Sequence, residues 1–408
     1  MAMKLRVLMS LLLALVSISL SGCGGHYTCG VTFGGGSCAN SGGGLGTGGG
    51  GAGSGLVAYG YFASFSSNGQ PSVGIALQKL DVGAGTFIAQ SAFTAPLIPP
   101  FPTGMVTVKK QFAYIPSADG TLYTFGIDSS TGYLTSIGTS NPIVVSGGDS
   151  ISASADGTLI FVGDAAGQQI SVYTVNTDGT LSGVAGDPFA VGISPRVMTT
   201  DGQSKFLYAT AGPGSTNVAA FSIGSGGVLT PFSGGLIGST VAAIASESTG
   251  KYLFGVSNLS GDTSIHVFSI NTSTGGLTAL NSALTTGTPR NLSVHPNGTW
   301  VYAFNQDPIL NEIEPVEGFD FDSSTGALTP MGASPFSDVL ANAGPIEPSG
   351  QFMFGLGLTL QGGGLKSSVN PYAIDSTSGA ISSWPLGVDQ ALGFPGIDAA
   401  TYAVTDAQ

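Results

Sequence analysis

One pattern of about ten residues recurs seven times in this 408-residue chain, which is the feature that most restricts how it can fold. Each copy consists of alternating apolar residues, a turn rich in Asp, Asn, Ser, Thr and Gly, and a short apolar return. Successive copies begin 47, 48, 48, 47, 51 and 53 residues apart, a period typical of repeat architectures. This pattern, the hairpin motif, occupies residues 78–87, 125–134, 173–181, 221–229, 268–277, 319–328 and 372–381.

The hairpin motif predicts a β-hairpin. In the copy FSINTSTGGL, Phe268 and Ile270 point to one face of a strand, and the residues from Asn271 to Gly276 tolerate a tight turn. A second turn followed by aromatic and β-branched residues precedes most copies, as in PNGTWVYAF at 296–304. Two hairpins in each repeat give about four short strands. The sequence therefore predicts an all-β fold, a seven-bladed β-propeller of four-stranded antiparallel blades.

Composition and chain length fit this fold. The chain contains 66 Gly and 22 Pro, and 8% of its residues are charged, which suits short strands joined by tight turns. We expect one propeller domain over residues 56–408, because each blade packs only on its neighbours. An open ring would leave unpaired strand edges, and strand-like segments lie outside the motifs at Leu56–Phe65 and at 394–404. We therefore expect strands from both termini to close the ring in one shared blade.

The N-terminal residues resemble a bacterial lipoprotein signal. Lys4 and Arg6 precede the apolar run Val7–Leu20, which is short for a membrane span and is followed by Ser21-Gly22-Cys23. The resemblance implies that residues 1–22 are removed and that Cys23 is lipidated, which would anchor the chain in a membrane. It further implies export to the outer membrane or cell surface of a bacterium. The alternative is an ordinary secretory signal in which the cysteine is coincidental.

Residues 23–55 are expected to form a tether between the anchor and the propeller. From 34 to 55 the chain is almost entirely Gly, Ser, Ala and Thr, a composition typical of flexible linkers. Cys29 and Cys38 are the cysteines that remain besides Cys23. In an oxidising compartment they are candidates for a disulfide, and the alternative is two free thiols.

Charge and motif content exclude several classes of partner. Without Lys4 and Arg6, 8 basic and 23 acidic side chains remain, a formal net charge of −15. We therefore expect no nucleic acid partner and no anionic lipid surface for the body of the chain. The sequence contains neither a metal-binding Cys/His cluster nor the HExxH or GxSxG pattern, and its two Trp are too few for the docking of a quinoprotein propeller. We expect no metal and no cofactor.

The strands and hairpin motifs together resemble the lactonase-type seven-bladed propeller family, which includes 6-phosphogluconolactonases and fungal muconate-lactonising enzymes. The resemblance covers residues 56–404 through strands of the type PxG[KRT][YF]LY and hairpins of the type [FY]xIDxxTGxL. It implies a metal-independent lactonase that uses His, Arg and Glu side chains around the centre of the ring, including a GPRH-like motif. Residues 287–291 read GTPRN, with Asn291 at the histidine position, and the partial match at Ser194–Val197 also lacks histidine.

The three histidines offer little catalytic potential. His26 lies in the tether, His266 falls within a strand and is expected to be a partly buried structural side chain, and His295 falls in a turn expected on the face opposite the ligand face. The repeated residues Asp128, Asp322 and Asp375 share one position of the hairpin motif, where we expect them to bond to the turn rather than to calcium.

Ligand-binding candidates come from the starts of the innermost strands and the loops beside them. Two of them, Arg196 and Arg290, could hold a carboxylate or phosphate; the alternative is that each caps carbonyls of a neighbouring blade. The candidates at near-equivalent positions in four blades are Asp149, Arg196, Arg290 and Asn342, and those in loops on the same face are Asp164, Asn258 and Asn305.

Two functions follow from these observations. The first is an envelope-anchored propeller that binds a protein or carbohydrate partner, with insertions around 307–316 and 358–368 as natural contact regions. The second is a lactone hydrolase, in which Arg196 and Arg290 bind an anionic sugar lactone and an acidic residue activates water.

Overall fold

The computed structural model describes most of the chain beyond residue 56. The described residues are 57–63, 74–81, 86–89, 99–138, 143–212, 214–232, 240–257, 259, 261–307, 312–361, 364–383, 390–395 and 401–406. Residues 51–408 form one compact unit, to which all of the following refers. The predicted signal, the lipidation site at Cys23 and the Cys29/Cys38 pair lie outside the described residues. Within the described part, no helix is long and apolar enough to cross a membrane.

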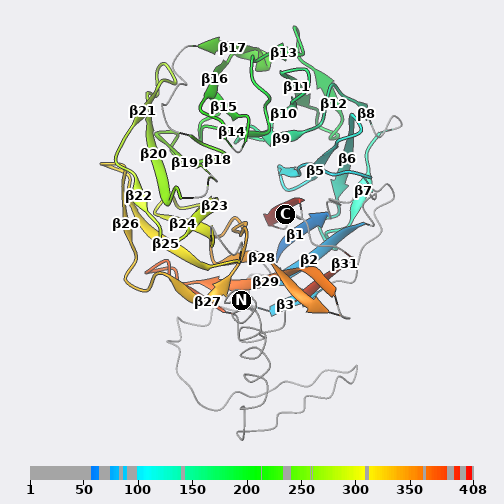
Figure 1. Ribbon diagram of the computed structural model, residues 1–408. Coiled ribbons are helices and arrows are strands. Elements are labelled where there is room, and N and C mark those ends of the chain that lie inside the picture. Colours follow the sequence, from blue (N-terminus) through cyan, green and yellow to red (C-terminus); the bar gives the residue numbers. More distant parts are fainter. Residues whose placement is uncertain are drawn as a thin grey trace, which may run out of the picture. The chain divides into compact units, whose positions relative to one another are not determined.

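The described strands form seven antiparallel sheets, arranged around a ring in Figure 1. We number these blades 1 to 7. Blade 1 contains β4 (Val106–Val108), β5 (Phe112–Ser117), β6 (Thr121–Ile127), β7 (Leu134–Ser136) and β8 (Ile143–Val144). Blade 2 contains β9 (Ser150–Ala153), β10 (Leu159–Asp164), β11 (Gln169–Val175), β12 (Leu181–Gly183) and β13 (Phe189–Ala190). Blade 3 contains β14 (Val197–Thr200), β15 (Phe206–Thr210), β16 (Val218–Ile223) and β17 (Leu229–Phe232), with the 3-10 turn η1 (Ser225–Gly227) before β17.

The second half of the ring repeats this order. Blade 4 contains β18 (Ala243–Ser246), β19 (Tyr252–Val256), β20 (Ser264–Ile270), β21 (Leu277–Ala279) and β22 (Ala283–Leu284). Blade 5 contains β23 (Thr288–Val294), β24 (Trp300–Gln306), β25 (Pro315–Asp322), β26 (Ala327–Pro330) and β27 (Phe336–Leu340). Blade 6 contains β28 (Phe352–Gln361), β29 (Gly364–Ile374), β30 (Ile381–Ser383) and β31 (Gln390–Pro395), and its innermost segment is joined to β28 by the bridges Ala343↔Leu356 and Ile346↔Met353.

Blade 7 joins the two ends of the propeller. Its order is β3 (Thr86–Ala89), β2 (Ile75–Asp81), β1 (Val57–Ala63) and β32 (Thr401–Asp406). β1 and β32 pair antiparallel from Ala58↔Asp406 to Ala63↔Thr401. The prediction that strands from both termini close the ring is confirmed, with the last strand of the chain innermost and β1 beside it.

Four of the described blades contain a short fifth strand in addition to the four predicted. β8, β13, β22 and β27 each pair with the third strand of their blade, next to the fourth. In blade 4, β21 pairs with residues 268–270 of β20, which leaves the start of β20 open for β22 to pair with Ser264 and Ile265. The sequence did not predict these strands. β8, β13 and β22 contain two residues each, too few to show an alternating pattern, whereas β27 contains five.

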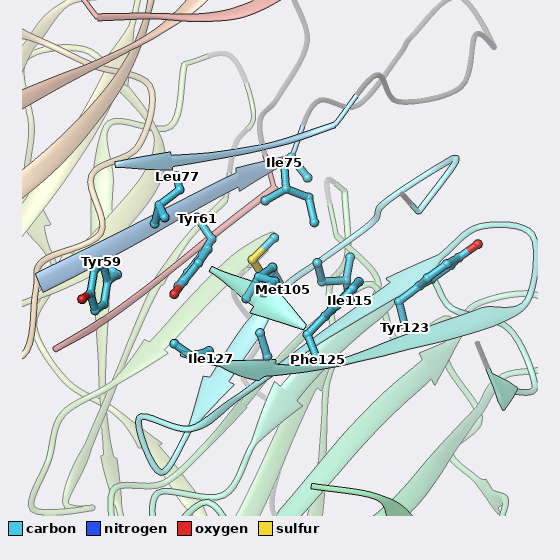
Figure 2. Packing of buried hydrophobic residues seen from close by; sticks show 12 residues of the cluster. Tyr59, Tyr61, Ile75, Leu77, Met105, Ile115, Tyr123, Phe125 and Ile127 are labelled. Carbon is cyan, nitrogen blue, oxygen red and sulfur yellow. The ribbon is translucent and has the colours of Figure 1, made fainter. Parts of the chain in front are cut away.

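The hydrophobic core is divided into seven clusters, each lying between two adjacent blades. The cluster between blades 7 and 1 is shown in Figure 2, where Tyr59, Tyr61 and Leu77 of blade 7 face Ile115 and Phe125 of blade 1. Since no cluster belongs to one blade alone, a blade buries its faces only when both neighbours are present. This arrangement is what the repeat period predicts for a propeller.

In the hairpin motifs whose turns the structure describes, the motif glycine contacts the preceding blade. Gly275 of blade 4 has φ +74°, and a Cβ atom built on it would overlap Phe206 of blade 3 and lie 2.6 Å from Phe232. The carbonyl oxygen of Gly275 also accepts a hydrogen bond from the Tyr208 hydroxyl at 2.8 Å. Corresponding tyrosine hydroxyls donate to motif glycines in three further pairs of blades: Tyr61 to Gly132, Tyr114 to Gly179 and Tyr302 to Gly379. The repeated turn position is thus also a contact between blades.

Glycine substitutions should distinguish the stability contributed by this contact between blades from the cost of a left-handed backbone. Gly226 in blade 3 has φ +73°, nearly that of Gly275, but a Cβ there would meet nothing within 4 Å. We expect Gly226→Ala to cost about 1–2 kcal/mol from the left-handed backbone alone. Gly275→Ala should cost about 1–3 kcal/mol more, because the methyl overlaps two aromatic rings. Urea unfolding of both variants gives the comparison, and equal destabilisation would rule out the proposed blade-to-blade contact.

Candidate functional site

The candidate ligand residues lie at one end of the ring, which we call the entry end. Here the innermost strand of each blade begins and the second strand ends. The backbone N–H groups of Asp149, Arg196 and Asn342 donate to carbonyl oxygens of Gly163, Thr210 and Leu356, respectively, at 2.8, 3.0 and 2.7 Å. These bonds place the three residues at equivalent positions in blades 2, 3 and 6. The equivalent residue in blade 4 is Ala242, which brings no polar side chain.

Arg196 and Asp149 come together across the boundary between blades 2 and 3. Arg196 Nη1 lies 3.9 Å from Asp149 Oδ1, and the Arg196 side chain is 56% exposed. Asp149 Oδ2 accepts the backbone N–H of Ala165 at 2.7 Å, which holds the carboxylate against blade 2. An ion pair this long and exposed contributes little to stability. Arg196 therefore presents its guanidinium largely to solvent at the entry end.

Asp164 supports a loop and is largely occupied there. Its Oδ1 accepts the N–H of Gly167 at 2.7 Å, and its Oδ2 accepts the hydroxyl of Ser146 and the amide of Gln169, both at 3.0 Å. Burial by itself would raise the pKa of Asp164, but these hydrogen bonds outweigh it, and the pKa is lowered. Asp164 is therefore an ionised anchor of the loop after β10, with few acceptor sites left for a ligand.

Arg290 sits in a β-bulge. Pro289 pairs with Asn305 and Asn291 pairs with Phe304, so the register between β23 and β24 shifts by one residue at Arg290. A bulge bends the strand locally and changes the direction of the extra side chain, and bulges are common next to binding sites. The structure therefore places Arg290 differently from Arg196, which precedes its strand without a bulge.

Asn305 lies in β24 rather than in a loop and bonds within blade 5, whereas Asn342 bonds from blade 6 to blade 5. Asn305 is fully buried, and its Nδ2 donates to Glu317 Oε1 at 2.6 Å. The same carboxylate oxygen accepts the backbone N–H and the hydroxyl of Thr286, at 2.8 and 2.7 Å. Asn342 Oδ1 accepts the amide of Gln306 at 3.4 Å, which links blade 6 to blade 5. The remaining candidate, Asn258, lies outside the described residues.

Buried oxygen atoms without a hydrogen-bond partner gather in blade 5. Among the described residues they are Gln78 Oε1, Thr288 Oγ1, Asn305 Oδ1 and Glu314 Oε2, and the last three belong to β23, β24 and the connection between β24 and β25. A Cβ on Gly287 would collide with Glu314 Oε2 and lie 3.1 Å from the Cβ of Asn305. The Glu314 carboxylate thus fills space left by a glycine, close to Asn305. Unsatisfied buried acceptors are uncommon in native proteins and indicate a missing donor, such as a ligand or water.

The same surroundings alter the acidity of Glu314. Burial raises the pKa of its carboxyl group, and the negative charges of Asp307 and Glu317 raise it further. A carboxyl group with a raised pKa can exchange a proton near neutral pH more readily than an ordinary glutamate. Glu314 is therefore the entry-end residue best suited to proton transfer.

The sequence analysis missed Thr288, Glu314 and Glu317 as site residues. Glu314 lies in the insertion 307–316, which was noted only as a contact region, and Glu317 directly follows it. The signal that could have found them is this insertion itself. The insertion lengthens the interval between the fifth and sixth copies of the hairpin motif to 51 residues. It comes after the hairpin whose first strand contains Arg290.

The hairpin aspartates bond to their own turns. Asp128 Oδ1 accepts the N–H groups of Ser130 and Thr131 at 3.0 and 2.8 Å. Asp322 accepts from Ser324, and Asp375 accepts from Thr377 and Ser378 in the same way. Hydrogen bonds from Ser130 and Thr131 lower the pKa of the exposed Asp128 to about 2. These bonds are those of an Asx turn, as the sequence analysis expected.

The opposite end of the ring holds a cavity of about 270 Å³ lined by Asp201, Glu247 and His295, among others. These polar groups already have partners. Glu247 Oε1 accepts the N–H groups of Lys251 and Tyr252, and Asp201 Oδ1 accepts those of Lys205 and Phe206. His295 Nε2 donates to the Gly350 carbonyl at 2.7 Å, which joins blades 5 and 6. The buried acids therefore anchor the turns between first and second strands.

These geometries define the class of the protein as a β-propeller of seven antiparallel blades. Residues 229–338, from β17 to β27, match the family model described as "Lactonase, 7-bladed beta-propeller". No curated protein matches the chain.

Solved structures show the same fold at low sequence identity. A putative 6-phosphogluconolactonase from Bacteroides uniformis is similar with a TM-score of 0.63 and 17% identity, over 83% of this chain and 98% of that chain. A putative 6-phosphogluconolactonase from Bacteroides fragilis has a TM-score of 0.63 and 14% identity, over 88% and 99%. A periplasmic gluconolactonase from Pseudomonas aeruginosa has a TM-score of 0.56 and 14% identity, over 80% and 94%.

The raised pKa of Glu314 predicts a pH-dependent cost in stability. Because the folded state holds the proton more tightly than the unfolded chain, its stability falls as pH rises from the ordinary glutamate range through the folded-state pKa. Glu314→Gln removes this charge. We expect the variant to unfold at a higher temperature than the native sequence at pH 8, with the difference vanishing near pH 4. Thermal unfolding at a series of pH values tests this, and a difference independent of pH would contradict it.

Proposed function

We propose that this chain is an envelope-anchored β-propeller whose entry end binds a hydroxylated anion, of the class of sugar acids and their lactones. The observation that carries the proposal is the group of unpartnered oxygens of Thr288, Asn305 and Glu314 beside the bulge of Arg290. Amide and carboxyl oxygens accept hydrogen bonds from sugar hydroxyls, and the Thr288 hydroxyl can also donate. A guanidinium offers paired donors to a carboxylate or phosphate.

The rest of the entry end fits a binding role. Arg196 is exposed and its pairing with Asp149 is long, so it can reach a ligand at little cost. No group of three or more His, Cys, Asp or Glu that could hold a metal occurs among the described residues. The fold similarity includes proteins described as gluconolactonases, which supports sugar-derived ligands as the first class to test.

Ligand binding can be measured directly on the purified full chain. Isothermal titration against aldonic acids, aldonolactones and their phosphate esters should identify a ligand, and Arg290→Ala should weaken its binding by about 10- to 100-fold, the value of a charge-assisted hydrogen bond. Arg196→Ala reports whether the second arginine contributes. Lys205→Ala is the matched control, because Lys205 lies in a turn at the opposite end of the ring. Affinity unaffected by Arg290→Ala would place the ligand elsewhere and defeat the proposal.

A second function, lactone hydrolysis, is favoured by the raised pKa of Glu314. In this reaction Glu314 would take a proton from water while Arg290 holds the anionic substrate. Continuous titration of released acid during incubation with the lactones distinguishes the two functions. Turnover that Glu314→Gln lowers by about 100-fold or more supports hydrolysis, since general bases contribute at least that much. Binding without turnover supports the binding role.

The anchoring part of the proposal rests on the N-terminal sequence. Lys4, Arg6 and the run Val7–Leu20 followed by Cys23 resemble a lipoprotein signal, and the linker-like residues 34–55 would separate the lipid from the propeller. We propose the outer membrane or cell surface of a bacterium as the location.

Lipidation can be tested by expressing the full chain in bacterial cells supplied with labelled palmitate. We expect the native chain to carry label and to partition into the detergent phase of Triton X-114, and Cys23→Ser to lose both properties because the thiol that accepts the lipid is gone. Cys29→Ser serves as the control and should keep both. A native chain without label would show that the segment acts as an ordinary secretory signal.

A further inference from the structure

A serine, a histidine and an aspartate form a continuous hydrogen-bonded line in blade 4, outside the entry-end site. His266 Nε2 lies 3.2 Å from Asp262 Oδ2, and the Ser282 hydroxyl lies 3.3 Å from His266 Nδ1. His266 is half-buried in β20, and Ser282 is exposed just before β22. The sequence analysis treated His266 as structural because it falls within a strand. Ser282 is brought beside it by β22, a fifth strand that the sequence did not predict.

Strand register explains why these side chains meet. β22 pairs with the start of β20 through Ser264↔Leu284 and Ile265↔Ala283. Continuing this register by one residue places Ser282 opposite His266. Directly opposed residues project to the same face of a sheet, as do residues two and four apart on one strand. His266 and Ser282 therefore share one face, while Ile265 and Ala283 point into the core between blades 4 and 5. Asp262 precedes β20, and its hydrogen bond to His266 places its carboxylate beside the imidazole.

Asp262 is held in place as an acceptor. Its Oδ1 accepts the backbone N–H of Ser264 at 3.0 Å, and its own N–H donates to the carbonyl of Leu259 at 3.1 Å. Burial acts to raise the pKa of Asp262, but hydrogen bonds from Ser257, His266 and Ser264 outweigh this and lower it. An ionised carboxylate can only accept, so Nε2 of His266 carries the proton. Nδ1 is then free to accept the proton of the Ser282 hydroxyl.

We propose that Ser282, His266 and Asp262 form a serine-nucleophile site that transfers acyl groups from activated esters. The Ser282 hydroxyl oxygen attacks the ester carbonyl as its proton moves to His266 Nδ1, and Asp262 stabilises the resulting imidazolium. The C–O bond to the leaving group breaks, and the leaving alcohol takes the proton from His266. Water then hydrolyses the acyl-serine by the same proton route and releases the carboxylic acid.

The neighbouring side chains indicate the class of substrate. Leu284, two residues after Ser282, is 70% exposed, and Leu259, whose carbonyl bonds to Asp262, is 41% exposed. The hydrogen bonds described here for Asp262, His266 and Ser282 involve no Lys or Arg side chain. An apolar acyl chain suits these surroundings better than a sugar acid. The site therefore differs in substrate from the entry end, and it does not depend on the function proposed there.

Covalent labelling tests the site directly. The full chain is treated with diisopropyl fluorophosphate, and peptides are mapped by mass spectrometry; hydrolysis of p-nitrophenyl butyrate is followed in parallel. We expect label on Ser282 and slow turnover. Ser282→Ala should abolish both, and His266→Gln should lower the labelling rate by about 100-fold, the contribution of a positioned general base. Asp262→Asn should also lower the rate, because the carboxylate no longer stabilises the imidazolium.

Two control variants keep the result specific. Ser273→Ala removes an exposed serine of the same blade and should leave labelling unchanged, as should Lys205→Ala in a turn of blade 3. Unchanged thermal unfolding of Ser282→Ala and His266→Gln shows that the blade is intact. The proposal fails if Ser282 remains unlabelled in the native chain, or if His266→Gln is labelled at the native rate.

Discussion

The contact between a motif glycine and the second strand of the preceding blade is the constraint on which this ring depends. Gly275 shows why: its left-handed backbone makes the hairpin turn, the missing side chain admits Phe206, and its carbonyl oxygen accepts the Tyr208 hydroxyl. Burial raises the pKa of Tyr208, so the hydroxyl stays protonated and able to donate. One position thus determines the local turn and the distance between blades together, which explains why the most regular feature of the sequence reports architecture.

The features on which our proposals rest occur where this regularity is interrupted. Arg290 leaves the ladder through a bulge, Glu314 belongs to an insertion between two strands, and Ser282 is positioned by a fifth strand of two residues. By contrast, the buried acids that recur in several blades, such as Asp201 and Glu247, are satisfied by backbone N–H groups of their own turns. The repeated acidic residues of this ring therefore stabilise turns, whereas the residues of the proposed sites lie where the repeat is interrupted.

The fold was largely predictable from the sequence, and the site only in part. Period and alternation depend on residues close in the chain, so they predicted seven blades, their hairpins and the closure by both ends. Asp149, Arg196, Arg290 and Asn342 were placed at near-equivalent positions by counting from turns, and the structure shows the equivalent backbone bond for Asp149, Arg196 and Asn342. The bulge at Arg290, the pairing of Asn305 with Glu317, and the approach of Ser282 to His266 depend on register and side-chain direction, which no local pattern encodes.

The closure of blade 7 has a consequence for how the chain reaches its final form. β32 follows every other described strand in the chain, and it completes the blade that β1 begins. Until residues 401–406 arrive, β1 has one open edge, and Tyr59 and Tyr61 already require blade 1 on one face. The ring therefore cannot be finished blade by blade during synthesis. A chain that stops before Thr401 leaves the edge of β1 unpaired. That edge can pair with a strand of another molecule, so residues 401–406 decide between a closed ring and intermolecular association.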